Sequence, residues 1–238
     1  FRKLVKYIKD NDFQFICTPW DEKAVKYLIN LNVEIIKIAS CSFNDWNLLE
    51  ETVKYKKNII ASTAGATELE IDRVVSFLKN KKKNFSLMHC VGEYPTINKN
   101  LHLDQIDFLK NKYSNVEIGY STHEEPKNIE NIQIAIAKGA TIFEKHVGVK
   151  SKRYDINKYS AEPEQVLKWL YSAKRAIEVC GGLKNERKQF SKKEKQDLRI
   201  LYRGAYASKN LTKSTYLKNN YFLAMPNIKG QLVAKELG

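Results

Sequence analysis

The stretch NIIASTAGATELEIDRVVSFLKNKKKNFSLMHC, residues 58–90, decides the fold. Two short apolar runs, 58–62 and 85–90, flank a longer segment, 66–80, in which apolar residues recur at helical spacing. Thr67, with Glu70 three residues later, forms the capping-box pattern that starts a helix. The stretch therefore predicts a strand, a helix and a second strand, which is the repeating unit of a parallel sheet.

The same alternation continues in both directions along the chain. Further strands are predicted at 13–17, 33–39, 116–121 and 141–147, and helices at 1–10, 21–31, 45–55, 103–113, 126–139 and 163–181. The predicted strands are almost continuously apolar, as expected for parallel strands that are covered on both faces. Six strand–helix units in a row indicate a parallel α/β fold.

Two architectures fit six such units, and polar residues at the predicted strand ends distinguish them. Nearly every predicted strand ends in, or is followed by, a polar residue: Thr18, Ser40, Ser62 with Thr63, His89, Ser121 with His123, and His146. A doubly wound sheet gathers its site at one switch point, and no GxGxxG turn is present. A barrel brings all strand ends to one ring. We therefore expect a (β/α)8 TIM-type barrel in residues 1–182, made of barrel strands 3 to 8 and lacking the first two βα units, which would precede Phe1.

The pattern changes after Gly182. Residues 183–197 form a predicted charged linker that contains a helix start. Residues 198–238 contain short strands and turns without a long helix, so we expect a partial, small β-rich domain there.

The composition narrows the classes of function. The chain has 41 Lys+Arg against 27 Asp+Glu, a formal net charge of +14, which also suits a nucleic-acid binder. The basic runs at 79–84 and 192–195 lack interleaved aromatic residues, so we expect anionic small molecules and no nucleic acid. No apolar run approaches the ~20 residues that cross a bilayer, so no membrane contact is expected.

The spacing of the cysteines bears on whether the protein works in a reducing or an oxidising compartment. Four of them are scattered without a CxxC pair, Cys17, Cys41, Cys90 and Cys180, and three of the four lie in or beside apolar runs. This pattern predicts buried thiols in a reducing compartment, and hence a cytoplasmic protein.

Three histidines, His89, His123 and His146, lie at or near predicted strand ends. Neutral imidazole is a favoured ligand of divalent transition metals. A strand-end histidine is also a common hydrogen-bonded structural residue, so the histidines leave both a metal site and a structural role open.

Lys37 interrupts the apolar run VEIIKIAS, where an unpaired charge is expensive. With nearby hydroxyls it would form a phosphate cradle, although each hydroxyl alone could cap a strand: Thr18, Ser40, Ser62 and Ser121. Lys145 could pair with the adjacent Glu144, or either lysine could form a Schiff base.

Seven strings occur in order: FICTPWDEKAVKYL, IIKIAS, IIASTAGATELEI, LMHCVGEYPT, IGYSTHE, GATIFEKHV and YSAEPEQ. Together they resemble the N-acetylneuraminate (sialic acid) synthase family of nonulosonate synthases. GAYASKNLTKSTYLKNNYFLAMP resembles the start of that family's antifreeze-like (SAF) domain.

The resemblance implies a set of site residues. His123 and His146 would be the metal ligands and, with Lys37, the catalytic residues. Phosphoenolpyruvate would contact Thr18, Lys37, Ser40, Ser62 and Ser121, and the sugar would contact Trp20, Tyr94 and Asn157.

The resemblance also implies the chemistry: a transferase that forms a carbon–carbon bond between phosphoenolpyruvate and an open-chain sugar aldehyde. A divalent metal, typically Mn²⁺ with Mg²⁺ or Co²⁺ as alternatives, would activate the aldehyde, and phosphate would leave by C–O cleavage. The complete protein would be a domain-swapped homodimer.

Several positions depart from the family pattern. Cys41 and Ser42 replace Gly-Glu, Thr122 replaces the aspartate of GYSDH, an aspartate falls on Ile156 or Asn157, and Met225 replaces an arginine before proline. We therefore expect a divergent branch with a different acceptor sugar. Another phosphoenolpyruvate-dependent 3-deoxy-ulosonate synthase and a catalytically silent sugar-binding relative remain as alternatives.

Overall fold

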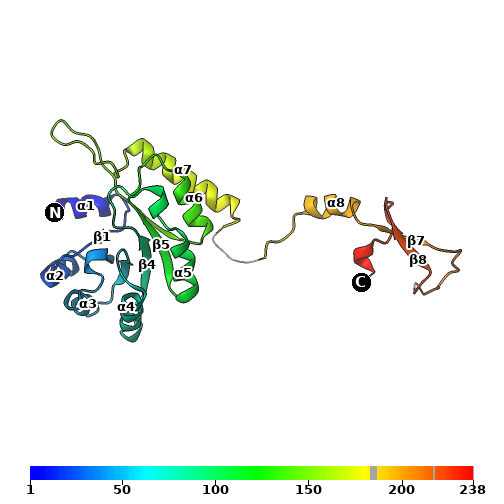
Figure 1. The fold of residues 1–238 in the computed structure, drawn as a ribbon, viewed down its shortest axis with the longest axis horizontal. Coiled ribbons are helices and arrows are strands. Elements are labelled where there is room, and N and C mark those ends of the chain that lie inside the picture. The colour runs from blue at the N-terminus through cyan, green and yellow to red at the C-terminus, as the bar shows by residue number, and fades with distance from the viewer. Residues whose placement is uncertain (183–186, 217, 238) are drawn as a thin grey trace. The chain divides into compact units, whose positions relative to one another are not determined.

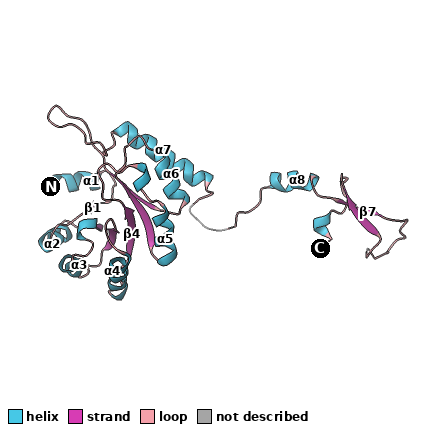
Figure 2. Ribbon diagram, viewed as in Figure 1, coloured by secondary structure: helices cyan, strands magenta, loops and turns pink. Residues whose placement is uncertain are grey.

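The computed structural model describes residues 1–182, 187–216 and 218–237. The chain divides into two compact units, Phe1–Lys184 and Asn185–Gly238. Figure 1 gives the element labels used below, and Figure 2 separates helices from strands.

The first unit alternates strands with helices. Its strands are β1 (Ile16–Cys17), β2 (Ile35–Ile38), β3 (Asn58–Ser62), β4 (Phe85–Cys90), β5 (Glu117–Thr122) and β6 (Ile142–Lys145). Its helices are α1 (Arg2–Asp10), α2 (Glu22–Asn30), α3 (Trp46–Thr52), α4 (Glu68–Asn80), α5 (Asp104–Lys112), α6 (Glu130–Ala137) and α7 (Pro163–Val179), with short 3₁₀ turns at Ser40–Ser42 and Asn98–Asn100.

Within residues 1–182 the strands form one six-stranded sheet in the order β1-β2-β3-β4-β5-β6, and every neighbouring pair is parallel. The sheet is curved, and Figure 1 shows helices α2 to α7 arranged around its outside. A doubly wound sheet would reverse its strand order at a switch point, and this order never reverses. The unit therefore has the architecture of a TIM-type α/β fold, as predicted.

Side-chain alternation separates the two faces of the sheet. In β2, Ile36 and Ile38 are fully buried and belong to the core that lies under the helices. Lys37, between them, points to the opposite face because successive strand residues alternate. The face that carries Lys37 is the concave inner face of the curved sheet, so the strand pattern itself brings a lysine there.

The elements are shorter than predicted at several ends. The first strand is Ile16–Cys17 rather than 13–17, and the last is Ile142–Lys145 rather than 141–147. His146 therefore follows the last strand instead of lying inside it. The capping box at Thr67 and Glu70 is present as predicted and starts α4.

The placement of His89 differs from the expectation that it ends a strand at the ring. It is the penultimate residue of β4, its ring is stacked on Tyr120, and its Nε2 lies 2.7 Å from the Leu101 carbonyl oxygen. Cys90, one residue later, takes the inner-face position. The alternation of side chains along β4 therefore puts a thiol, not an imidazole, at this strand's end.

The cysteines only partly follow the expectation of buried thiols. All four are free; Cys90 is buried and Cys17 is half-buried. Cys41 and Cys180 are exposed, so fewer thiols are buried than the three expected.

The second unit contains α8 (Lys192–Ile200) and an antiparallel hairpin of β7 (Gly204–Ala207) and β8 (Tyr221–Ala224), followed by a 3₁₀ turn at Ala234–Glu236. Helix α8 begins inside the segment predicted as a linker, 183–197, of which residues 183–186 lie outside the described residues. Among the helices that the structure describes, none has the length and apolar character needed to span a membrane.

Candidate active site

A pocket of about 830 Å³ opens at the carboxyl ends of the parallel strands. It brings together nine of the ten predicted site residues: Thr18, Trp20, Lys37, Ser40, Ser62, Tyr94, Ser121, His123 and His146. They come from segments spread over more than 120 positions of the chain, and the parallel sheet collects them because all its strands end on the same side.

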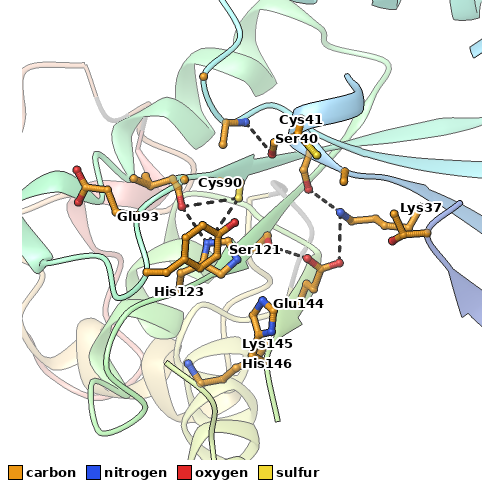
Figure 3. A pocket seen from close by; sticks show the side chains of 18 of the residues that line it. Lys37, Ser40, Cys41, Cys90, Glu93, Ser121, His123, Glu144, Lys145 and His146 are labelled. Carbon is orange, nitrogen blue, oxygen red and sulfur yellow. Dashed lines mark hydrogen bonds and ion pairs between the residues drawn. The ribbon is translucent and has the colours of Figure 1, made fainter. Parts of the chain in front are cut away.

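Lys37 is the central cation of the pocket floor. It is 7% exposed, and its Nζ donates a hydrogen bond of 2.8 Å to Ser62 Oγ on the neighbouring strand. The same Nζ lies 3.5 Å from the carboxylate of Glu144 on β6. Ser121 Oγ donates to the other oxygen of that carboxylate at 2.7 Å. Figure 3 shows Lys37, Ser121 and Glu144 turned toward one another.

Ser40 and Thr18 complete the hydroxyl groups of the pocket. Ser40 Oγ accepts a hydrogen bond of 3.1 Å from the backbone N–H of Ala64, which ties the ends of β2 and β3 together. Thr18 follows β1 directly and is half-buried. Hydroxyls and one ammonium group around a common space provide the donors that an oxyanion needs.

The two predicted metal ligands lie side by side. The ring centroids of His123 and His146 are 5.2 Å apart. His123 is buried, and its Nδ1 lies 2.8 Å from the carbonyl oxygen of Val91. A carbonyl only accepts, so Nδ1 is the donor, and in the neutral ring Nε2 is the nitrogen whose lone pair can bind a metal. Burial, followed by the neighbouring His123, lowers the pKa of His146, which favours the neutral imidazole.

These residues fit a divalent metal held by two imidazoles. Metal-bound histidines usually donate their second ring nitrogen to a carbonyl or carboxylate, as His123 does to Val91. Across the described ranges, no group of three or more His, Cys, Asp or Glu side chains forms a ready metal cage. A two-histidine site would leave coordination positions for substrate oxygens.

Lys145 has partners other than the one predicted for it. Lys145 does not pair with Glu144. Its Nζ lies 3.6 Å from Glu124 and 3.2 Å from Thr122 Oγ1, to which it donates a hydrogen bond. The side chain of Lys145 is only 4% exposed, and this burial lowers its pKa. Its Nζ lies over the ring of Trp169 on α7. The lysine with a carboxylate partner in the pocket is Lys37.

Thr122, which stands where the family pattern has an aspartate, forms its hydrogen bond with Lys145 and not with His123. The Val91 carbonyl holds the imidazole instead, and Thr122 accepts from Lys145 on the outer side of the sheet. The loss of that aspartate therefore leaves His123 with a hydrogen-bond partner.

Two residues of this region were missed by the sequence reasoning. Glu144 lies two residues before His146, and that spacing in an extended segment predicts a shared face. Tyr159 has its ring 5.1 Å from that of His146 and 5.3 Å from that of Tyr94. It comes from the long connection between β6 and α7, where no regular pattern could place it.

Asn157 is the predicted site residue that the structure leaves out of the pocket. Its exposed side chain accepts from the backbone N–H of Tyr159 at 3.2 Å, and it lines a separate hollow with Pro95, Lys150 and Gln165. The described structure therefore gives Asn157 no contact with the pocket of Lys37 and the histidines.

Known proteins match this chain over most of its length. The NeuB family matches residues 1–186. An N-acetylneuraminate-9-phosphate synthase of Drosophila melanogaster is 33% identical over 70% of the chain, and an N,N'-diacetyllegionaminic acid synthase of Campylobacter jejuni is 32% identical over 89% of it. The chain spans 45% and 63% of these two relatives.

A solved structure from Chromobacterium violaceum, described as a putative spore coat polysaccharide biosynthesis protein E, is also similar to this chain. It superposes with a TM-score of 0.94 at 47% identity, covering 100% of this chain and 70% of that one. With the family match over residues 1–186, the ordered strand-end motifs and the pocket that they form, the chain belongs to the NeuB family.

Proposed function

We propose that the full-length protein condenses phosphoenolpyruvate with an open-chain sugar aldehyde, giving a nonulosonic acid and phosphate. The observation that carries the proposal is the convergence of a buried lysine, three serines and two adjacent imidazoles in one pocket. The relatives named above are synthases of two such acids. Because the chain spans part of their length, the activity is proposed for the whole protein.

The donor is assigned to the floor of the pocket. Lys37 is the ammonium group for the anion, and its hydrogen bond to Ser62 fixes the direction of Nζ. Hydroxyls of Thr18, Ser40 and Ser121 supply further donors around it. Holding the donor in one orientation places its alkene carbon for attack on the aldehyde, and such positioning is a large part of catalysis.

The acceptor is assigned to the histidine side of the pocket. His123 and His146 would hold a divalent ion, Mn²⁺ in our proposal, which when bound supplies Lewis-acid polarisation of the aldehyde oxygen. The rings of Tyr94 and Trp20 are 56% and 69% exposed and form part of the rim where the sugar would enter.

The proposed bond changes balance as follows. The alkene carbon of phosphoenolpyruvate bonds to the aldehyde carbon, whose oxygen gains a proton to become a hydroxyl. The oxygen of a water molecule adds to the phosphate-bearing carbon and loses both protons, which balance the one gained by the aldehyde oxygen and the one taken by the departing phosphate. Phosphate departs with its bridging oxygen, so the C–O bond breaks and the new keto group takes its oxygen from water.

The acceptor is proposed to differ from N-acetylmannosamine. Cys41 and Ser42 stand where the family pattern has Gly-Glu, and Met225 stands where it has arginine. The thioether of Met225 cannot donate a hydrogen bond to the acyl carbonyl of N-acetylmannosamine, as an arginine could. A homodimer in which residues 198–238 act as an SAF domain reaching a second subunit, and a cytoplasmic location, are parts of the same proposal.

The experiment incubates the full-length protein with phosphoenolpyruvate, Mn²⁺ and a panel of aldoses. We expect phosphate release with at least one unphosphorylated hexose, and a product mass equal to donor plus acceptor plus water minus phosphoric acid. A preference for a phosphorylated four- or five-carbon aldose, giving a seven- or eight-carbon product, would favour another 3-deoxy-ulosonate synthase. Binding without phosphate release would indicate a catalytically silent relative.

A further inference from the structure

The carboxylate of Glu144 occupies two donor groups of the pocket that could otherwise hold a substrate anion. One of its oxygens receives a hydrogen bond of 2.7 Å from Ser121, and the other lies 3.5 Å from Lys37 Nζ. Both partners belong to the group assigned to phosphoenolpyruvate. A substrate anion and Glu144 therefore require the same donors.

The pocket offers Lys37 little alternative compensation. Its side chain is 9% exposed, and its other partner is the neutral hydroxyl of Ser62. A buried ammonium group needs an opposite charge. The carboxylate of Glu144 provides it, and at 43% exposure that side chain has solvent on one side into which it can turn.

We propose that Glu144 is a built-in counter-anion that the donor must displace, and that it thereby sets the charge selectivity of the pocket. This inference rests on the proposed function. A ligand with both a carboxylate and a phosphate can replace both contacts of Glu144, one at Lys37 and one at Ser121. A ligand with a single carboxylate can replace one contact and leaves the competition with Glu144 in place.

The mechanism assigned to the pocket does not use Glu144, and sequence motifs alone do not identify this role. A carboxylate next to a phosphate site usually weakens anion binding by repulsion. Here the repulsive group is held by the same atoms that receive the ligand. Glu144 therefore lowers the affinity most for ligands that do not displace its carboxylate from Lys37.

The test compares Glu144→Gln with the wild type in the full-length protein, by calorimetric titration of phosphoenolpyruvate and of pyruvate. Glutamine keeps the size of the side chain and can still accept from Ser121, but removes the charge. We expect phosphoenolpyruvate to bind about threefold to tenfold more tightly, because a charge-assisted contact no longer has to be broken. Pyruvate should gain by a larger factor, so the preference for phosphoenolpyruvate narrows.

Glu93→Gln is the matched control. Glu93 lies at the rim of the same pocket, but both of its carboxylate oxygens accept from Asn100 Nδ2 at 3.0 Å. This variant makes the same change in net charge and should alter neither affinity by more than about twofold. A thermal melt of each variant checks that it is folded.

The outcomes separate the two proposals. No binding of phosphoenolpyruvate to the wild type contradicts the proposed function itself. Binding to the wild type with unchanged or weaker affinity in Glu144→Gln, or with an unaltered preference over pyruvate, overturns the role of Glu144 alone. Equal gains in Glu144→Gln and Glu93→Gln would show a general charge effect and also overturn it.

Discussion

Two lysines with buried side chains lie in strands of the same sheet and face opposite ways. Lys37 of β2 points to the concave face, where Ser62 and Glu144 surround it. Lys145 of β6 points outward, where Glu124, Thr122 and Trp169 of α7 surround it. Both are charges in a strand, yet the alternation turns the side chain of Lys37 into the pocket and that of Lys145 into the packing between sheet and helix, although Lys145 also borders the pocket.

The comparison extends to the histidines. His123 and His146 lie together in the pocket, whereas His89 is stacked on Tyr120 in the outer layer. Residues of the same type thus divide into a group with open space in front of it and a group enclosed by helices. We expect changes in the first group to affect ligands, and changes in the second to affect the free energy of unfolding.

The largest effect is expected for the metal. Changing both His123 and His146 to Ala in the full-length protein should abolish the binding of manganese, because both imidazole ligands are lost. Elemental analysis after dialysis measures the stoichiometry. His89→Gln is the control, and it should retain the metal of the wild type. Unchanged manganese in the double variant would contradict the assignment.

A large effect on stability is expected on the outer side. Lys145→Met should lower the free energy of unfolding by about 3–5 kcal/mol, because it leaves the fully buried carboxylate of Glu124 without an opposite charge and with the Tyr120 hydroxyl as its remaining donor. Chemical denaturation measures it. The double variant Lys145→Met with Glu124→Gln removes both charges and should regain part of the loss. If the two variants are equally unstable, the ion pair is not the cause.

A smaller effect is expected for pH. Burial lowers the pKa of His89, so the unfolded chain binds more protons than the folded one in the range just below the usual pKa of about 6.5. This contribution to stability is complete above that pH and is lost as the pH falls toward the folded-state pKa.

His89→Gln should therefore make the free energy of unfolding less steep between about pH 7 and pH 5. Denaturation at several pH values measures the slope. His102→Asn is the control: His102 is exposed and has a positive φ of 44°, which asparagine tolerates. An unchanged slope in His89→Gln would contradict the prediction.

Much of the fold could be predicted from the sequence. Six apolar runs alternating with helical segments indicated a parallel sheet, and polar residues after the strands indicated one shared mouth. The side-chain direction at strand ends was less predictable, because a shift of one residue reverses the face. His89 was therefore expected at the ring, where Cys90 lies.

The site could be predicted where it belongs to strands, and not where it belongs to long connections. Lys37, Ser62 and Ser121 stand at regular positions of β2, β3 and β5, and the sheet brings them together. Asn157 and Tyr159 lie in the connection between β6 and α7, whose path no periodicity specifies. Glu144 was missed because its sequence neighbour, Lys145, suggested a local pair that the alternation of strand residues prevents.

The division between the two lysines is the central claim, and one titration tests it most directly. Phosphoenolpyruvate is titrated into the full-length wild type, Lys37→Met and Lys145→Met, at a temperature at which circular dichroism shows all three folded. We predict that Lys37→Met loses affinity by roughly tenfold to over a hundredfold, the value of one charge-assisted contact of about 1.5–3 kcal/mol. Lys145→Met should stay within about twofold of the wild type. Equal losses in both variants, or borohydride trapping of a pyruvate adduct on either lysine, would contradict the account.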